Sequence, residues 1–159
     1  MAKIIGSPTR YIQGRGELAN LAKHAGAIGE TMFILVDKFV KPLVMPSIEA
    51  GMGDRKFEVV EFGGECSMTE INRVIEVLKE KGGDVVVGIG GGKTHDTAKA
   101  VGYYTGHPVV IVPTIASTDA PCSALSVIYT DEGVFEKYLF LPSNPNIVLV
   151  GAILSQKHF

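Results

Sequence analysis

Three consecutive glycines, a lysine and a threonine follow directly after an apolar run near the middle of the chain. Residues 85–89 are β-branched apart from one glycine, residues 90–92 are glycines, and Lys93 and Thr94 open a helix-forming segment. A strand that turns sharply into a helix leaves the N–H groups of the first helical turn unpaired and partially positive. Glycines let an anion approach that backbone closely. The pattern therefore predicts a binding site for the phosphate groups of a nucleotide.

The spacing of these residues departs from two common phosphate-binding motifs. A Walker A loop would need a glycine where Val87 stands, and a dinucleotide fingerprint counted from Gly88 and Gly90 would need a glycine at Lys93. The alternative is a glycine-rich turn without a ligand. Such a turn sacrifices backbone entropy at each glycine and gains nothing that a single glycine would not give. We therefore favour the binding site.

The side chains that follow the glycines differ in how strongly the sequence favours a ligand-binding role for them. Lys93 would bring a cation to the diphosphate and Thr94 a hydroxyl, although both residues could merely begin a helix. A lysine there opposes the helix dipole, which favours ligand contact for Lys93. Asp96 is ambiguous, because the dipole alone would favour a carboxylate in the first turn. From its position, His95 is expected to be an ordinary surface or packing residue.

Polar groups also follow two other apolar runs. Asp37 ends the run at residues 31–36, where its carboxylate would hold ribose hydroxyls or cap a helix, and both interpretations stay open. A second group of short polar side chains lies between two prolines and suits either a polyol ligand or a capped turn. Its members are Thr114, Ser117, Thr118 and Asp119.

The elements that would position these groups alternate along the chain. We predict strands at residues 3–5, 10–12, 31–36, 57–62, 85–89, 108–112, 123–130, 134–141 and 147–150. We predict helices at residues 18–25, 67–81 and 93–104, and a broken or kinked one at 38–50 because of Pro42 and Pro46.

This alternation indicates an α/β fold, a Rossmann-like parallel sheet flanked by helices, with a β-hairpin near the C-terminal end. Ser67 and Glu70 form a capping box at the start of one helix. Ligands of such sheets bind outside the carboxyl ends of the strands, where Asp37, residues 90–94 and residues 114–119 would converge.

Composition narrows the function further. The chain has 159 residues and a net charge of −2, which suits one globular domain and argues against a general binder of nucleic acid or membrane surfaces. It has no apolar run of membrane-spanning length and no signal-peptide core at its start. Cys66 and Cys122 lack metal-like spacing, so a reduced, cytoplasmic protein is expected. Histidines at metal-binding spacing and a Ser-His-Asp constellation are absent from the sequence, so we assign neither metal ligands nor catalytic residues.

Residues 90–99 resemble a family signature. They match the pattern Gly-Gly-Gly-Lys-x-x-Asp-x-Ala-Lys, which is typical of the iron-containing (group III) alcohol dehydrogenases. Residues 7–14, 37–40, 62–67 and 113–129 resemble in particular the bacterial glycerol dehydrogenases of that family. The resemblance extends to about residue 150, and residues 151–159 are an atypical tail.

The resemblance implies an N-terminal NAD-binding half of an enzyme that oxidises glycerol, or a related small polyol, to dihydroxyacetone. Asp37 would hold the adenosine ribose and Asp119 would contact glycerol. The diphosphate would contact Gly90, Gly91, Gly92, Lys93, Thr94, His95 and Asp96. The nicotinamide half of NAD would be surrounded by Thr114, Ser117, Ser123, Leu125 and Tyr129.

The resemblance also implies components beyond these residues. The family holds a divalent metal, zinc or iron, with an aspartate and two histidines of a helical C-terminal domain that this sequence lacks. We therefore expect a truncated chain that is inactive alone and that associates with itself or with other subunits through the exposed interdomain face. The alternative is a non-catalytic module for nucleotide binding or subunit association.

Overall fold

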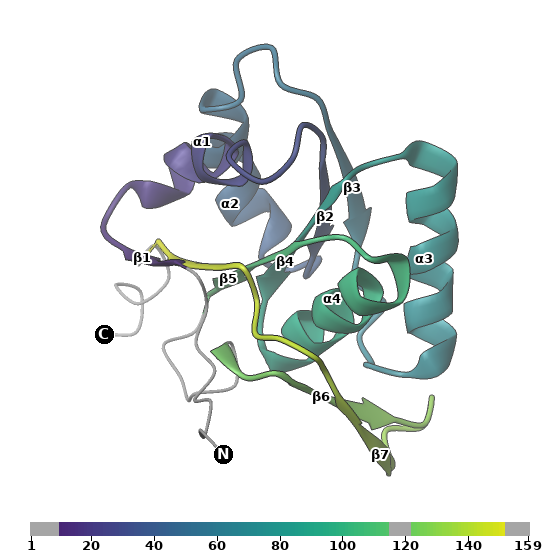
Figure 1. Cartoon of the computed structure of the whole chain (residues 1–159). Coiled ribbons are helices and arrows are strands. Elements are labelled where there is room, and N and C mark those ends of the chain that lie inside the picture. Colours follow the sequence, from purple (N-terminus) through teal and green to yellow (C-terminus); the bar gives the residue numbers. More distant parts are fainter. Residues whose placement is uncertain (1–9, 115–121, 152–159) are drawn as a thin grey trace.

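Six parallel strands form one sheet with helices on both faces (Figure 1). The computed structural model describes residues 10–114 and 122–151. Across the sheet the order is β1 (Arg10–Gln13), β8 (Ile147–Val150), β5 (Val109–Pro113), β4 (Val85–Gly90), β2 (Met32–Val36) and β3 (Phe57–Glu61). Every neighbouring pair is parallel, as the alternation of strands and helices predicts.

The two faces of the sheet bury separate apolar cores. One core packs Met32, Ile34 and Val36 of β2 against the short helices η1 (Glu17–Asn20) and α1 (Leu21–Ala25) and against α2 (Lys41–Ala50). The intervening residues of β2 face α3 (Met68–Lys81) and α4 (Gly92–Thr105) on the other side. Because both faces are covered, β2 and β4 are buried along their whole length, which explains their continuous apolar sequences.

Local signals explain most helix boundaries. The hydroxyl of Ser67 accepts a hydrogen bond from the Glu70 N–H at 3.2 Å, as expected of an N-cap, and Gly82 ends α3. Glu70 does not complete the reciprocal half of the predicted capping box, since its carboxylate instead accepts the Gly63 N–H at 2.6 Å. Helix α2 is continuous across Pro46 and not broken there, with Pro42 in its first turn, where a missing N–H removes no helical bond.

A separate antiparallel hairpin follows β5 and packs on α4. It consists of β6 (Leu125–Tyr129) and β7 (Phe135–Phe140), as predicted, with an irregular register beside Tyr129. Alternate residues of β6 face α4, so Ser126 and Ile128 are buried, while Leu125 and Tyr129 are partly buried. The first predicted strand, residues 3–5, lies outside the described residues, and β1 pairs in parallel with β8.

Candidate functional site at the carboxyl edge of the sheet

The carboxyl ends of β2, β4 and β5 meet at one edge of the sheet. The Asp37 N–H donates to the Ile89 carbonyl at 3.0 Å, and the Thr114 N–H donates to the Gly90 carbonyl at 3.1 Å. The predicted convergence of Asp37, the glycine-rich turn and the start of the polar loop is therefore confirmed as far as Thr114. The predicted residues Ser117, Thr118 and Asp119 lie outside the described residues.

The glycines of the turn have two different structural settings. A Cβ on Gly90 would lie 2.8 Å from the Thr94 Oγ1 and 3.1 Å from the Asp37 Cβ, so the chain passes there only as glycine. Gly91 and Gly92 instead have ordinary φ angles, and a Cβ on either would meet nothing within 4 Å. Among the described glycines, only these two combine open space with an ordinary backbone. Neither steric crowding nor a positive φ angle therefore requires glycine at either position.

Helix α4 begins at this turn without a side-chain cap. Its N-cap residue is Gly91, which has no side chain to accept a bond from the first turn, whereas α3 is capped by Ser67. Among the described residues no side chain caps this first turn, whose N–H groups carry partial positive charge at the carboxyl edge of the sheet. Together with the open space at Gly91 and Gly92, this arrangement fits an anion such as a diphosphate.

Lys93 lies at the rim of this turn with its ammonium group partnered. The Nζ is 3.1 Å from the Glu65 Oε2 and 5.0 Å from the centre of the Tyr129 ring, and the side chain is half exposed. Both contacts come from elements distant in sequence, the β3–α3 loop and β6. In this structure the ammonium is thus engaged by Glu65 and Tyr129, and ligand contact by Lys93 stays a prediction.

Thr94 and His95 complete the first turn and are buried, at 2% and 3% exposure. Neither ring nitrogen of His95 makes a hydrogen bond of good geometry within the described residues, although the backbones of Val112 and Gly90 lie near the ring. Burial, followed by the nearby charge of Lys99, lowers the pKa of His95 to about 4. The imidazole is therefore neutral at pH 7 and acts as a packing residue, which is one of the alternatives expected for it.

Asp96 and Lys99 form a buried ion pair one turn further along α4. The Lys99 Nζ is 3.2 Å from the Asp96 Oδ1, and the exposure of the two side chains is 1% and 15%. Asp96 also accepts the Val127 N–H at 3.0 Å, and its carbonyl accepts the Ser126 hydroxyl at 2.8 Å. These bonds fasten the hairpin to α4. In this structure the Asp96 carboxylate is directed to β6, and sequence reasoning alone missed this role.

Burial acts against both charges of this pair. It raises the pKa of Asp96 and lowers the pKa of Lys99, while the mutual attraction of the two groups opposes both shifts. The Lys99 ammonium also lies 3.2 Å from the Ser123 carbonyl and 3.3 Å from the Ser123 hydroxyl. Ser123, predicted to be beside the nicotinamide, thus contacts the same buried cation.

Asp37 uses one carboxylate oxygen to cap the turn before α2. Its Oδ1 accepts the N–H of Phe39 at 2.8 Å and that of Val40 at 3.3 Å. The structure therefore supports the capping alternative, and the ribose contact stays a prediction. Leu125 and Tyr129 are partly buried residues of β6, and the Lys93 ammonium over the Tyr129 ring brings that strand next to the glycine-rich turn.

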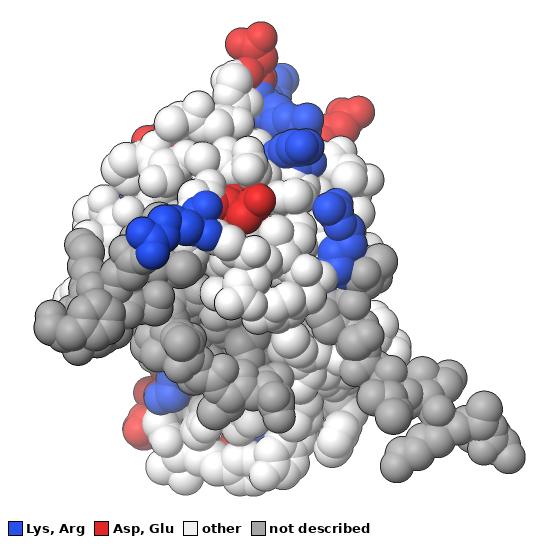
Figure 2. Space-filling view, turned by 90° about the vertical axis from the view of Figure 1, so that its left-hand side faces the viewer, with Lys and Arg blue, Asp and Glu red and all other residues white. Residues whose placement is uncertain are grey.

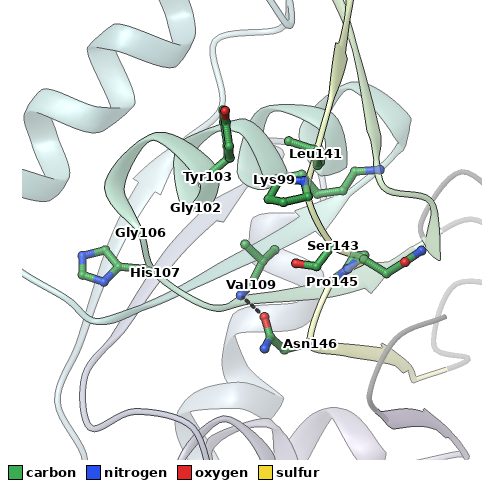
Figure 3. A pocket seen from close by; sticks show the side chains of 12 residues that line it. Lys99, Gly102, Tyr103, Gly106, His107, Val109, Leu141, Ser143, Pro145 and Asn146 are labelled. Atoms are coloured by element: carbon green, nitrogen blue, oxygen red, sulfur yellow. Dashed lines mark hydrogen bonds between the residues drawn. The ribbon is translucent and has the colours of Figure 1, made fainter. Parts of the chain in front are cut away.

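Two hollows beside α4 lie away from this edge. A cavity of about 200 Å³ lies toward the opposite end of the helix, and Tyr103, His107, Ser143 and Asn146 are among the residues that line it (Figure 3). The Asn146 Oδ1 accepts the Val109 N–H there at 3.0 Å. A groove of about 700 Å³ runs between α3 and α4, lined by Ile75, Tyr104 and others. The cavity is smaller than typical ligand pockets, and neither hollow includes the glycine-rich turn.

Charged side chains and potential metal ligands are dispersed over the described part of the chain. On the face drawn in Figure 2, basic side chains occur in small groups separated by uncharged residues. Within residues 10–114 and 122–151, His, Cys, Asp and Glu side chains form no group of three or more that could hold a metal ion. No helix in that part of the chain is long and apolar enough to cross a membrane.

Comparisons with known proteins identify one family. The family model for iron-containing alcohol dehydrogenases matches residues 8–152. A glycerol dehydrogenase of Thermotoga maritima is 54% identical over 144 residues, covering 90% of this chain and 39% of that protein. The glycerol dehydrogenase of Citrobacter freundii is 48% identical over 159 residues, covering 99% of this chain and 44% of that protein.

Solved structures show the same similarity. A probable glycerol dehydrogenase from Sinorhizobium meliloti superposes with a TM-score of 0.89 at 45% identity, covering 96% of this chain and 42% of that one. Glycerol dehydrogenase from Schizosaccharomyces pombe gives a TM-score of 0.82 at 34% identity, covering 94% and 38%. The chain thus spans about two fifths of the length of the proteins that it matches.

Proposed function

The chain belongs to the iron-containing alcohol dehydrogenase family, and from this we propose that it is the NAD-binding α/β part of a glycerol dehydrogenase. Bound NAD would supply the hydride acceptor for oxidation of a small polyol, glycerol giving dihydroxyacetone. The similarity to glycerol dehydrogenases at 45–54% identity supports the substrate class. We also keep a cytoplasmic location and self-association as parts of this proposal.

The observation that carries the proposal is the open space at Gly91 and Gly92. A Cβ at either position would meet nothing within 4 Å, yet both are glycines at the uncapped start of α4. A ligand that approaches the backbone would explain both residues, because a Cβ would fill the space that the ligand needs. The N–H groups of the first helical turn and Lys93 favour an anionic ligand, and the diphosphate of NAD has that chemistry.

The other parts of the cofactor would lie along the same edge. We assign the adenosine ribose to Asp37 at the end of β2, and the nicotinamide half to Thr114, Ser117, Ser123, Leu125 and Tyr129. Asp119 would contact the polyol. We assign neither a metal ligand nor a metal-dependent step to residues 10–114 and 122–151, since no suitable group of side chains occurs there.

The first prediction tests the glycines directly. Gly92→Ala is expected to weaken NAD binding at least about tenfold, because the new methyl group would occupy the diphosphate position. The free energy of unfolding should stay the same or rise by up to about 1 kcal/mol, since alanine is the better helix former. Calorimetric titration with NAD and urea denaturation measure the two effects.

Ser143→Ala serves as the control, because Ser143 lines the cavity at the other end of α4. It should leave NAD binding unchanged. If Gly92→Ala binds NAD as tightly as the unchanged protein, or if Ser143→Ala weakens binding instead, the glycine-rich turn is not the cofactor site.

A further inference from the structure

The ammonium group of Lys93 is held between two partners at the rim of the glycine-rich turn. The Glu65 carboxylate is 3.1 Å from the Nζ, and the Tyr129 ring lies 5.0 Å away on the β6 side. These contacts draw the lysine toward the hairpin and the β3–α3 loop. The pair is partly exposed, with 48% of the Lys93 side chain and 21% of the Glu65 side chain accessible. Ion pairs of this exposure are weak and therefore exchangeable.

The Glu65 carboxylate is itself oriented by the fold. Its Oε1 accepts the N–H of Cys66 at 3.2 Å, while the other oxygen faces Lys93. The backbone bond from the Tyr129 N–H to the Cys66 carbonyl, at 2.8 Å, ties the same loop to β6. Glu65 is thus an oriented negative charge next to a helix start and a lysine that favour an anion.

We propose that Glu65 is an internal counter-ion, which Lys93 exchanges for the diphosphate when the nucleotide binds. The inference rests on the proposed function and adds a positioning residue to the same site. While Lys93 is paired with Glu65, the site is close to neutral and its attraction for unrelated anions is reduced. A diphosphate that also engages the α4 N–H groups displaces the carboxylate, because it contacts the helix start and the lysine together.

The exchange predicts a selective gain in affinity when Glu65 is neutralised. Glu65→Gln is expected to tighten binding of NAD and of ADP about two- to fivefold, the fold-change equivalent of an exposed ion pair. Adenosine, which has no phosphate, should bind with unchanged affinity. Calorimetric titration of the full chain with the three compounds measures the effect, and thermal unfolding verifies that the variant is folded. Should Glu65→Gln fail to fold, Glu65→Asp, which draws the carboxylate back by one methylene, replaces it.

A second ion pair at the same edge provides the matched control. Lys41 and Glu61 also lie 3.1 Å apart, and Glu61 ends β3. Glu61→Gln removes the same charge and should leave ADP binding unchanged. The unchanged protein, the two single variants Glu65→Gln and Lys93→Gln, and the double variant form a double-mutant cycle, which isolates the coupling between the two residues. In the Lys93→Gln background, Glu65→Gln should therefore no longer change the affinity for ADP.

The outcomes separate this inference from the proposed function. If the unchanged protein binds neither NAD nor ADP, the proposed function fails and the exchange fails with it. If it binds both, but Glu65→Gln gains no more than Glu61→Gln, the exchange alone is overturned. A gain that persists in the Lys93→Gln background also overturns it, because Glu65 would then act on the ligand directly.

Discussion

Two successive turns of α4 carry the same kind of ion pair in opposite environments. In the first turn Lys93 lies 3.1 Å from Glu65 and is half exposed. In the second, Lys99 lies 3.2 Å from Asp96 and is 1% exposed. The distances are nearly equal, so distance does not distinguish the pairs. Burial does, because water screens the first pair, whereas the second is strong only while both partners stay in place.

The difference divides the signature at residues 90–99 between two tasks. Its glycines and Lys93 face the open edge of the sheet, where a ligand can compete for them. Its Asp96 and Lys99 bind the backbone of Val127 in β6 and of Ser123 just before it, and so position β6 beside that edge. A motif that resembles a single ligand site thus contains a ligand-facing part and a part that holds the neighbouring element.

Among the substitutions, removing the buried cation should give the largest effect on stability at pH 7. Lys99→Met leaves the Asp96 carboxylate without its counter-charge, so we expect the free energy of unfolding to fall by about 3 kcal/mol. Urea denaturation at pH 7 measures it. Lys79→Met is the matched control, because Lys79 and Glu76 have the same i,i+3 spacing in α3 but are about 70% exposed.

The control should lose no more than about 0.5 kcal/mol, as is usual for an exposed pair. Equal losses in the two variants would show that burial does not determine how much an ion pair contributes to stability here. The contrast between the two pairs of α4 would then be wrong.

His95 provides a second test of the effect of burial. It lies in the first turn of α4 with Lys93, but its side chain is buried like that of Lys99 in the second turn. Its pKa of about 4 in the folded chain lies below the ordinary value of 6.5, so the unfolded chain binds more protons between these values. The stability due to neutral His95 is therefore complete above pH 6.5 and is lost as the pH falls toward 4. The full loss corresponds to roughly 3 kcal/mol.

Urea denaturation between pH 7 and pH 4.5 tests this dependence. His95→Leu should retain more of its stability than the unchanged protein as the pH falls, because leucine does not titrate. Thr97→Val, also buried in α4, should keep the slope of the unchanged protein. Parallel curves for His95→Leu and the unchanged protein would contradict the assignment.

The sequence predicted the elements with strong local signals. The apolar runs of β2 and β4, the Ser67 cap of α3 and the turn of the hairpin depend on neighbours within a few residues, so their patterns are readable. The edge where Asp37, the glycines and Thr114 meet followed from the parallel topology alone. Helix α2 was harder, because Pro46 favours a break that the packing of Val44 and Ile48 in the core overrides.

The contacts that define the site could not be predicted in the same way. Lys93 meets Glu65 across 28 residues, and Asp96 meets Val127 across 31, so both contacts depend on tertiary packing. The burial of His95 could not be predicted from the sequence either. Helix α4 is buried on most of its circumference and has no single apolar stripe from which an inner face could be identified.

A smaller loss of stability is expected from the contact between α4 and the sheet. The positions of both turns of α4 depend on this contact. A Cβ on Gly88 of β4 would lie 2.5 Å from the Ala98 Cβ, and neither group is the flexible end of a side chain. Gly88→Ala should therefore push α4 away and lower the free energy of unfolding by about 2 kcal/mol. Gly92→Ala, which also places a methyl group on the path of α4 but with nothing within 4 Å, should not lower stability.

The double variant Gly88→Ala/Ala98→Gly separates this clash from other effects of the methyl group. It removes the contact but places glycine in a helix, which costs about 1 kcal/mol, so it should recover part of the loss measured by urea denaturation. If the double variant is less stable than Gly88→Ala, the close contact with Ala98 does not set the position of α4. The bonds of Asp96 and Lys99 to β6 and to Ser123 would then determine the position of α4. The buried ion pair would contribute more to placing the helix than its packing on the sheet does.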